Sequence, residues 1–245
     1  MKRILCLLAL LVPFAGVAAG GGEYPLDKAP VDQSDTASLQ RGAKLFMNYC
    51  FGCHSTQYQR YQRVAEDLQI PAELMQQHLM FVQGPKIGDL MENSMADKDA
   101  AKWFGAAPPD LTLVARVRGA DWLYTYLRTF YADPKRPWGV NNLVFKDVGM
   151  PHVLQELQGV PSFVDEERMV DGKVETHKVL KTDGSGELST DEYDQAVADI
   201  VNFLVYAAEP MQQQRKSLGV WVMLFLALFF VLAYLLKKEY WRDVH

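Results

Sequence analysis

The sequence has 245 residues, of which 49% are hydrophobic and 22% are charged, and its formal net charge is −5. This composition excludes a disordered chain, and the length is sufficient for one sizeable domain with its own core. Because only three cysteines are present, a scaffold held together by several disulfides is excluded as well.

The first 19 residues predict a secretory signal peptide. Lys2 and Arg3 precede a short apolar run, and Val17 and Ala19 are placed like the −3 and −1 positions of a cleavage site. A short buried helix is the alternative interpretation. We expect cleavage after Ala19, so that residues 20–216 form an exported, periplasmic domain that begins with an extended leader.

A helix that begins near Ser38, whose hydroxyl can cap it, runs into the motif Cys50-Phe51-Gly52-Cys53-His54. Three chemistries compete for this motif. A thioredoxin-like dithiol would need a βαβ setting, and the flanks here are helical. Zinc would need four ligands, and the mature chain has no further cysteine, only scattered histidines. Covalent haem attachment uses the whole motif, because both thiols can add to vinyl groups while the histidine binds the iron.

Further helices are predicted along the domain. We expect them over residues 71–82, 97–104 and 121–131. The last of these is capped at its start by Asp121, and Trp122, Tyr126 and Phe130 share one of its faces. Ser189 begins the final helix with a capping box that Glu192 completes, and Pro210 ends it. Strands are scarce, and the best hairpin candidate spans residues 168–180 around an Asp171-Gly172 turn. The sequence therefore predicts a mostly α fold.

A haem iron bound by the motif would need a sixth ligand or an open position, and the sequence offers ten methionines. Met150 stands out because it follows an irregular loop and precedes Pro151, which stiffens the backbone. The other methionines are better explained by packing or by the membrane segment. His152 is the rival, with exposure on the surface as its alternative interpretation. An open position would instead permit ligand binding or oxygen chemistry.

A second metal site is suggested by residues 181–192, which partly match a calcium-binding loop. Asp183, Ser185 and Glu192 fall on ligand positions of that loop. Lys181 would occupy its first position, where a cation would repel calcium. We therefore interpret the stretch as a turn that leads into the capped helix.

Residues 218–236 form an uncharged apolar run, about 28 Å long as a helix, which matches the hydrocarbon thickness of a bilayer. Trp221 and Tyr234 near its ends, and Lys237 and Lys238 after it, are typical interfacial anchors. A fully buried helix is the alternative. We predict a single transmembrane helix over residues 217–237 in a bacterial inner membrane, followed by a cytoplasmic tail over residues 238–245.

The charge of the predicted exported domain indicates what kind of partner it meets. Residues 20–216 contain 28 acidic and 20 basic side chains, a net charge of −8. This acidity argues against nucleic acid as a partner, and it would help to attract a basic protein.

Several longer stretches resemble the cytochrome c1 family, the haem subunits of the ubiquinol:cytochrome c oxidoreductase (cytochrome bc1) complex. They are "CHSTQYQRY", "DAAKWFGAAPPDLTLVARVRG", "NNLVF" leading to "GMP", and "VADIVNFLVYAAEP" followed by "RKSLG" and the membrane helix. The resemblance covers nearly the whole mature chain. It implies a c-type cytochrome-like helical domain with insertions, plus one transmembrane helix.

The resemblance also implies a site. Cys50 and Cys53 would carry the thioethers of a single haem c, with His54 as proximal and Met150 as distal iron ligand. Among the nearby residues, a proline carbonyl is expected beside the imidazole, from Pro108 or, as we assign it, Pro109. Arg118 would approach a haem propionate, and Trp122 would lie beside the haem. Some relatives carry an additional disulfide between the haem motif and the methionine, and this sequence has none.

The function that the resemblance implies is electron transfer within an enzyme, without catalysis by this subunit itself. One electron would pass from the Rieske iron-sulfur protein to a soluble cytochrome c, in a dimeric complex that also contains cytochrome b and contacts membrane lipid. The alternative is a membrane-anchored monohaem cytochrome c subunit of a terminal oxidase or a nitric oxide reductase. A ligand sensor or small peroxidase with an open iron position is a further alternative.

Overall fold

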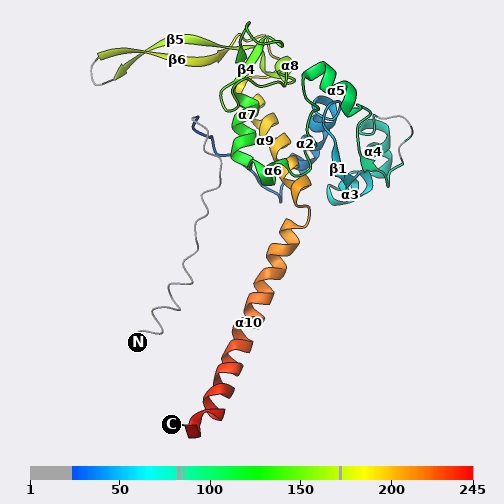
Figure 1. The fold of residues 1–245 in the computed structure, drawn as a ribbon, viewed down its shortest axis with the longest axis vertical. Coiled ribbons are helices and arrows are strands. Elements are labelled where there is room, and N and C mark those ends of the chain that lie inside the picture. The colour runs from blue at the N-terminus through cyan, green and yellow to red at the C-terminus, as the bar shows by residue number, and fades with distance from the viewer. Residues whose placement is uncertain (1–23, 82–83, 85, 171–172, 245) are drawn as a thin grey trace.

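The computed structural model describes residues 24–81, 84, 86–170 and 173–244. Helices dominate it, as predicted, and a helical body stands on one long C-terminal helix (Figure 1). In chain order the elements are α2 (Thr36–Tyr49), β1 (Thr56–Arg60), α3 (Tyr61–Asp67), α4 (Ala72–His78), β2 (Leu90–Met91), α5 (Asp97–Phe104), α6 (Val114–Val117), α7 (Ala120–Arg128), β3 (Phe130–Ala132), β4 (Val140–Asn142), α8 (Gln155–Gln158), β5 (Pro161–Val170), β6 (Lys173–Thr182), α9 (Thr190–Ala208), α10 (Gln212–Tyr240) and the 3-10 turn η1 (Arg242–Val244).

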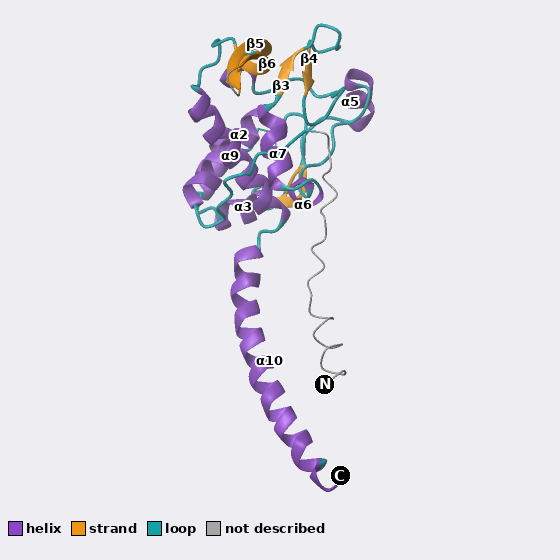
Figure 2. Ribbon diagram, turned by 90° about the vertical axis from the view of Figure 1, so that its left-hand side faces the viewer, coloured by secondary structure: helices purple, strands orange, loops and turns teal. Residues whose placement is uncertain are grey.

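The core of the domain is built around α9, against which α2 and α7 pack (Figure 2). The approach of α2 is close at Gly42, where an added Cβ would lie 2.0 Å from the carbonyl oxygen of Asp199. The Asp199 side chain is buried and accepts hydrogen bonds from Arg41 Nε at 2.6 Å and from the Ser38 hydroxyl at 2.7 Å. A buried carboxylate with these partners fixes the register of the two helices.

Two helix starts differ from the prediction. Asp35, rather than Ser38, caps α2 and accepts a hydrogen bond from the Ser38 backbone N–H, because the Ser38 hydroxyl is taken by Asp199. The predicted capped helix over residues 121–131 begins at Ala120, after Gly119, without a side-chain cap. Asp121 instead accepts a hydrogen bond from the backbone of Ala29 at 2.8 Å. Tertiary partners have replaced the expected local ones.

The remaining predicted helices are present with small changes. The helix α5 has the predicted bounds, and the capping box of Ser189 and Glu192 at the start of α9 is confirmed. The helix expected over residues 71–82 is shorter, because α4 ends at His78, and Val82 lies outside the described residues. The predicted helix over residues 121–131 ends at Arg128, because Phe130–Ala132 pair with Val140–Asn142 as β3 and β4.

The described strands form three two-stranded antiparallel sheets. The hairpin predicted over residues 168–180 is present and longer than expected, with Pro161 opposite Thr182 and Val170 opposite Lys173. It projects away from the helical body (Figure 1), and its turn lies outside the described residues. The short pairs β1–β2 and β3–β4 were not predicted.

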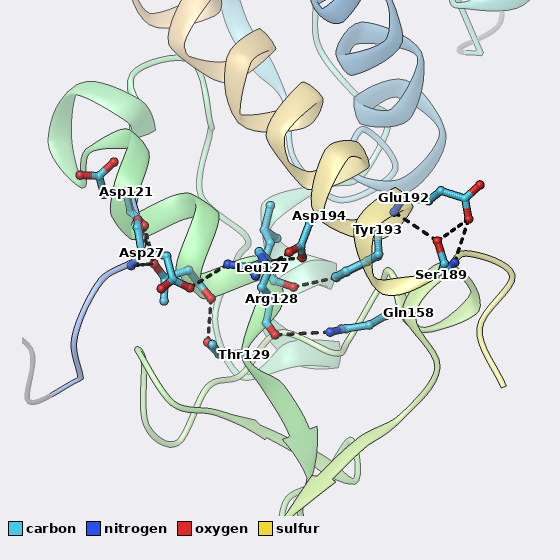
Figure 3. A network of polar contacts seen from close by, with 11 residues as sticks. Asp27, Asp121, Leu127, Arg128, Thr129, Gln158, Ser189, Glu192, Tyr193 and Asp194 are labelled. Carbon is cyan, nitrogen blue, oxygen red and sulfur yellow. Dashed lines mark hydrogen bonds and ion pairs between the residues drawn. The ribbon is translucent and has the colours of Figure 1, made fainter. Parts of the chain in front are cut away.

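Arg128, the last residue of α7, forms hydrogen bonds with α8, with α9 and with the leader (Figure 3). Its guanidinium donates to both carboxylate oxygens of Asp194 in α9, at 2.6 and 2.7 Å, and to Asp27 of the leader at 2.7 Å. Its backbone carbonyl accepts a hydrogen bond from Gln158 of α8 at 3.3 Å. The end of α7 is therefore fixed where the chain turns into β3.

The long helix α10 contains the apolar run, and its side chains are exposed along its length. It is the one candidate for a membrane span in the part of the chain that the structure describes. Glu209, just before it, accepts hydrogen bonds from Arg116 of α6 at 2.9 Å and from Arg215 of α10 at 2.5 Å. The predicted signal peptide lies outside the described residues.

Candidate haem-binding site

The cysteine motif continues the chain directly from α2. The backbone N–H groups of Cys53 and His54 both donate to the carbonyl of Cys50, at 3.0 and 2.9 Å, so the motif forms one tight turn. Cys50 is buried and Cys53 is half-buried, and both are free thiols. Burial raises the pKa of Cys50 to about 12 and raises that of Cys53, so both groups are protonated at neutral pH. The turn places two thiols and one imidazole next to each other.

The His54 imidazole is held by a backbone carbonyl. Its Nδ1 lies 2.7 Å from the carbonyl oxygen of Pro109, which can only accept, so Nδ1 carries the proton. Nε2 is thereby left with its lone pair free to bind a metal. Burial lowers the pKa of His54, with the Pro109 carbonyl and Asp110 opposing that effect. The ring is therefore neutral at pH 7, the form that coordinates iron.

Hydrogen bonds of the two residues after Pro109 explain why its carbonyl lies there. Leu111 N–H donates to the Ser55 carbonyl at 2.9 Å, and Asp110 Oδ2 accepts from Gln57 N–H at 2.7 Å. The segment after Pro109 thus runs beside the segment after His54. We call Cys50, Cys53, His54 and Pro109 the attachment side of the site.

Met150 lies on a loop between β4 and α8, and its sulfur meets a tyrosine. The Tyr126 hydroxyl donates to Met150 Sδ at 3.3 Å, and Met150 packs half-buried against the core. Burial raises the pKa of Tyr126, which therefore stays a neutral phenol. The sequence pattern assigned Tyr126 only to the apolar face of a helix. We call Met150, Tyr126, Phe130 and His152 the methionine side.

Two buried asparagines anchor the loop that carries Met150. Asn142 Nδ2 donates to the Tyr126 carbonyl at 2.7 Å, and its Oδ1 accepts from the backbone N–H groups of Val144 and Phe145 at 2.9 and 3.1 Å. Asn141 Oδ1 accepts from Asp147 N–H at 2.8 Å. These side chains replace a regular backbone ladder. Sequence reasoning did not assign them a role.

Arg118 and Trp122 adjoin the methionine side. The Arg118 guanidinium lies 5.0 Å from the centre of the Trp122 ring and 5.9 Å from that of Phe145. Trp122 in turn stacks on Tyr126, with the ring centres 4.8 Å apart. Arg118 is exposed, so its charge remains available to an anionic group. The segment from Pro109 to Arg118 therefore connects the two sides of the site.

His152 is buried, with 6% of its surface exposed, so the alternative interpretation of this residue as a surface histidine is wrong. Its ring stacks on Phe130 with the ring centres 4.9 Å apart. Burial lowers the pKa of His152 to about 4, against smaller opposing effects of Gln158 and Gly159. The imidazole is therefore neutral and packed against an aromatic ring.

These residues fit a c-type haem. Two free thiols and an imidazole whose Nδ1 is held by a carbonyl form one turn, and a thioether and an exposed guanidinium lie on other elements. This donor set is the one that covalent haem attachment with His and Met ligation requires. In the described residues, no group of three or more His, Cys, Asp or Glu side chains is arranged to hold a metal ion.

Comparison with known proteins agrees with this chemistry. The model of the cytochrome C1 family matches residues 27–244. The chain belongs to the cytochrome c1 family. It is 55% identical to cytochrome c1 of Allochromatium vinosum, over the whole chain and 99% of that relative. It is 47% identical to a protein of Nitrosomonas europaea named ammonia monooxygenase gamma subunit, and 28% identical to cytochrome c1 of Rhodospirillum rubrum, in both cases along the full chain.

Family membership establishes the coarse function. Cytochrome c1 proteins are the haem subunits of bc1 complexes, so the chain is a haem-bearing electron-transport subunit of a membrane-bound respiratory complex. Cytochrome b is the partner that this membership implies. The long apolar helix α10 is consistent with a membrane-bound subunit.

Proposed function

We propose that this chain carries single electrons from the Rieske iron-sulfur protein to a soluble cytochrome c, by means of one haem c attached through thioethers at Cys50 and Cys53. The observation that carries the proposal is the single turn that combines both free thiols with a carbonyl-bound His54. The haem supplies reversible one-electron chemistry at its iron. The enzymatic reaction itself belongs to the complex, of which this chain is the electron-carrying subunit.

His54 acts as the proximal ligand in this proposal. The Pro109 carbonyl holds Nδ1 as a donor, which directs Nε2 toward the metal and makes the imidazole a stronger base. The ring is thus held between the cysteine turn and the Pro109 carbonyl, which leaves it little freedom to rotate. A fixed ligand geometry keeps structural reorganisation during electron transfer small.

Met150 acts as the distal ligand, and its thioether favours reduced iron. A high reduction potential suits an acceptor late in a quinol oxidation chain. The Tyr126 hydroxyl orients the sulfur and withdraws electron density from it. Arg118, held over Trp122, offsets the negative charge of a propionate, and Trp122 shields one side of the site from water.

The placement in the membrane follows from the same proposal. Residues 1–19 are a signal peptide, residues 20–216 form the periplasmic domain, and residues 217–237 span a bacterial inner membrane once, with residues 238–245 in the cytoplasm. The ion pairs of Glu209 with Arg116 and Arg215 support a firm junction between the domain and α10. Cytochrome b and lipid contact the helix, and the complex is dimeric.

The soluble acceptor is a basic protein. The net charge of −8 on residues 20–216 favours fast encounter with a cationic partner, and salt slows such an encounter. Electron transfer to a basic cytochrome c should therefore slow steeply as ionic strength rises. A rate that is independent of salt would contradict this part of the proposal.

The deciding experiment is purification of the native complex through a tag on this chain. We expect cytochrome b and a Rieske protein to co-purify, and we expect haem to remain on this chain after denaturation. A haem-copper catalytic subunit in place of these partners would refute the proposal in favour of an oxidase or nitric oxide reductase subunit.

A second candidate function rests on the relative that is named ammonia monooxygenase gamma subunit. In that case the chain would serve a monooxygenase with the same haem chemistry. The same purification separates the two candidates, because a monooxygenase would co-purify in place of the Rieske protein.

A further inference from the structure

The loop residues around Met150 rest on two adjoining aromatic rings. Met150 Sδ accepts the hydrogen bond of Tyr126, and the His152 ring stacks on Phe130 with the planes 6° from parallel. Phe130 is fully buried and meets Tyr126 edge to face, with the ring centres 5.2 Å apart. Both ends of the tripeptide 150–152 therefore contact one aromatic pair, and Pro151 restricts the backbone between them.

The polar atoms of His152 point to a second anchor. Its Nε2 is buried, and so is Oε1 of Gln158 in α8, and neither atom has a hydrogen-bond partner among the described residues. The Gln155 N–H donates to the His152 carbonyl at 3.1 Å, which brings the start of α8 against His152. Gln158 is itself held by Arg128, to whose carbonyl its Nε2 donates at 3.3 Å (Figure 3). A buried donor and a buried acceptor are each costly when left unpaired, so pairing of these two atoms, directly or through one buried water, would be favourable.

We propose that His152 is a positioning residue for Met150: stacking on Phe130 and pairing of Nε2 with Gln158 hold the loop so that the thioether keeps its place beside Tyr126. This inference rests on the proposed function, in which Met150 is the distal ligand. His152 does not touch the iron in this account. It acts through the loop.

The loop needs such an anchor in its stretch between two buried core residues, Val148 and Leu154. Asn141 and Asn142 bind the first half, up to Asp147, and α8 begins only at Gln155. Arg136 reaches the carbonyls of Asp147 and Val148 at 2.6 and 3.2 Å. Between Val148 and Leu154, the contacts of Met150 and His152 with the aromatic pair help to oppose the conformational entropy of the segment. A sulfur acceptor alone is a weak tether.

The test measures how easily an added ligand displaces Met150 in the intact, haem-loaded complex. Imidazole is titrated into the ferric protein, and loss of the near-infrared absorption band of methionine-ligated haem is followed. His152→Phe keeps a stacking ring and removes Nε2, and Gln158→Met removes the acceptor at similar volume. We expect each variant to bind imidazole at least tenfold more tightly than the unmodified protein. His78→Phe, on the exposed surface of α4, is the matched control and should leave the affinity unchanged.

The double variant separates a specific pairing from general loosening. If Nε2 pairs with Gln158, the combined variant should bind imidazole no more tightly than the stronger single variant. Independent, multiplying effects would overturn the pairing. Imidazole affinities within twofold of the unmodified protein in both single variants would overturn the positioning role, and Gln158→Met alone decides this if His152→Phe does not assemble.

Failure of this inference can be told apart from failure of the proposed function. If the unmodified protein lacks the methionine band, Met150 is not the ligand. Both the positioning role of His152 and the proposed ligation by Met150 are then refuted. If the unmodified protein has the band and the variants bind imidazole no more tightly than it does, only the positioning role of His152 is refuted.

Discussion

The attachment side and the methionine side of the site are built in different ways. Cys50, Cys53 and His54 follow α2 without interruption, and one turn of backbone hydrogen bonds brings them together. Met150 lies on an irregular loop, and the tyrosine that meets its sulfur is 24 positions earlier in the chain. The first side depends mainly on local geometry and on the packing of α2 on α9, with the Pro109 carbonyl, 55 positions from His54, as an added contact. The second depends on long-range side-chain contacts, so it should be the easier side to disturb without unfolding the domain.

The largest effect is expected from removing the thiols. Cys50→Ala combined with Cys53→Ala should abolish covalent attachment completely, because no other cysteine of the exported domain can form a thioether. Haem that stays with the polypeptide during denaturing electrophoresis is the measurement. Gly52→Ala, where the added Cβ meets open space, is the control and should keep its haem. Haem that stays on the denatured double variant would refute thioether attachment at Cys50 and Cys53.

The close packing of α2 against α9 is tested by Gly42→Ala. The added Cβ would lie 2.0 Å from the Asp199 carbonyl oxygen, so α2 must move away from α9, at a loss of about 3 kcal/mol in the free energy of unfolding. Thermal unfolding of the purified protein measures it. In Gly219→Ala of α10 the added Cβ meets no neighbour among the described residues, and no comparable loss is expected. Equal effects of the two substitutions would show that the close approach does not matter.

On the methionine side, Met150→Leu should lower the reduction potential while leaving the covalent attachment intact. A fall on the order of 0.1 V is expected, because axial ligands set haem potentials over a range of about 0.8 V. A redox titration measures it, and the reduced variant should also gain the ability to bind carbon monoxide. Met75→Leu, in the buried core, is the control. An unchanged potential in Met150→Leu would refute Met150 as the ligand.

The smallest effect is expected for Tyr126→Phe, which removes one hydrogen bond from the sulfur. Without that donor the thioether gives more electron density to oxidised iron, so the potential should fall by about 20–40 mV, equivalent to about 0.5–1 kcal/mol. Tyr58→Phe, which changes an exposed hydroxyl, should leave the potential unchanged. A rise in potential would contradict the proposed direction of the bond.

The difference between the two sides also explains which features were predictable from sequence. Local features were predicted well: the cysteine motif at the end of a helix, the helix α5, and the capping box of Ser189 and Glu192. The predicted caps at Ser38 and Asp121 were wrong, because side chains distant in sequence took those hydrogen bonds. Periodicity assigned Tyr126 to a helix face and could not indicate that its hydroxyl reaches Met150.

The same limit applies to His152 and to the short strands. His152 follows a proline in a polar stretch, which favours exposure, and only the fold shows that Phe130 covers its ring. Strands such as β3 and β4, three residues each, are too short for an alternating pattern to identify. Asn141 and Asn142 are buried because the loop needs their side chains as partners, a requirement that depends on the path of the loop.

The most direct test of the site as a whole is near-infrared magnetic circular dichroism of the oxidised complex, which distinguishes the two axial ligands of a haem. The account predicts the signature of one histidine and one methionine in the unmodified protein, and its loss in Met150→Leu. A signature of two histidines would contradict it and would exclude Met150 as a ligand.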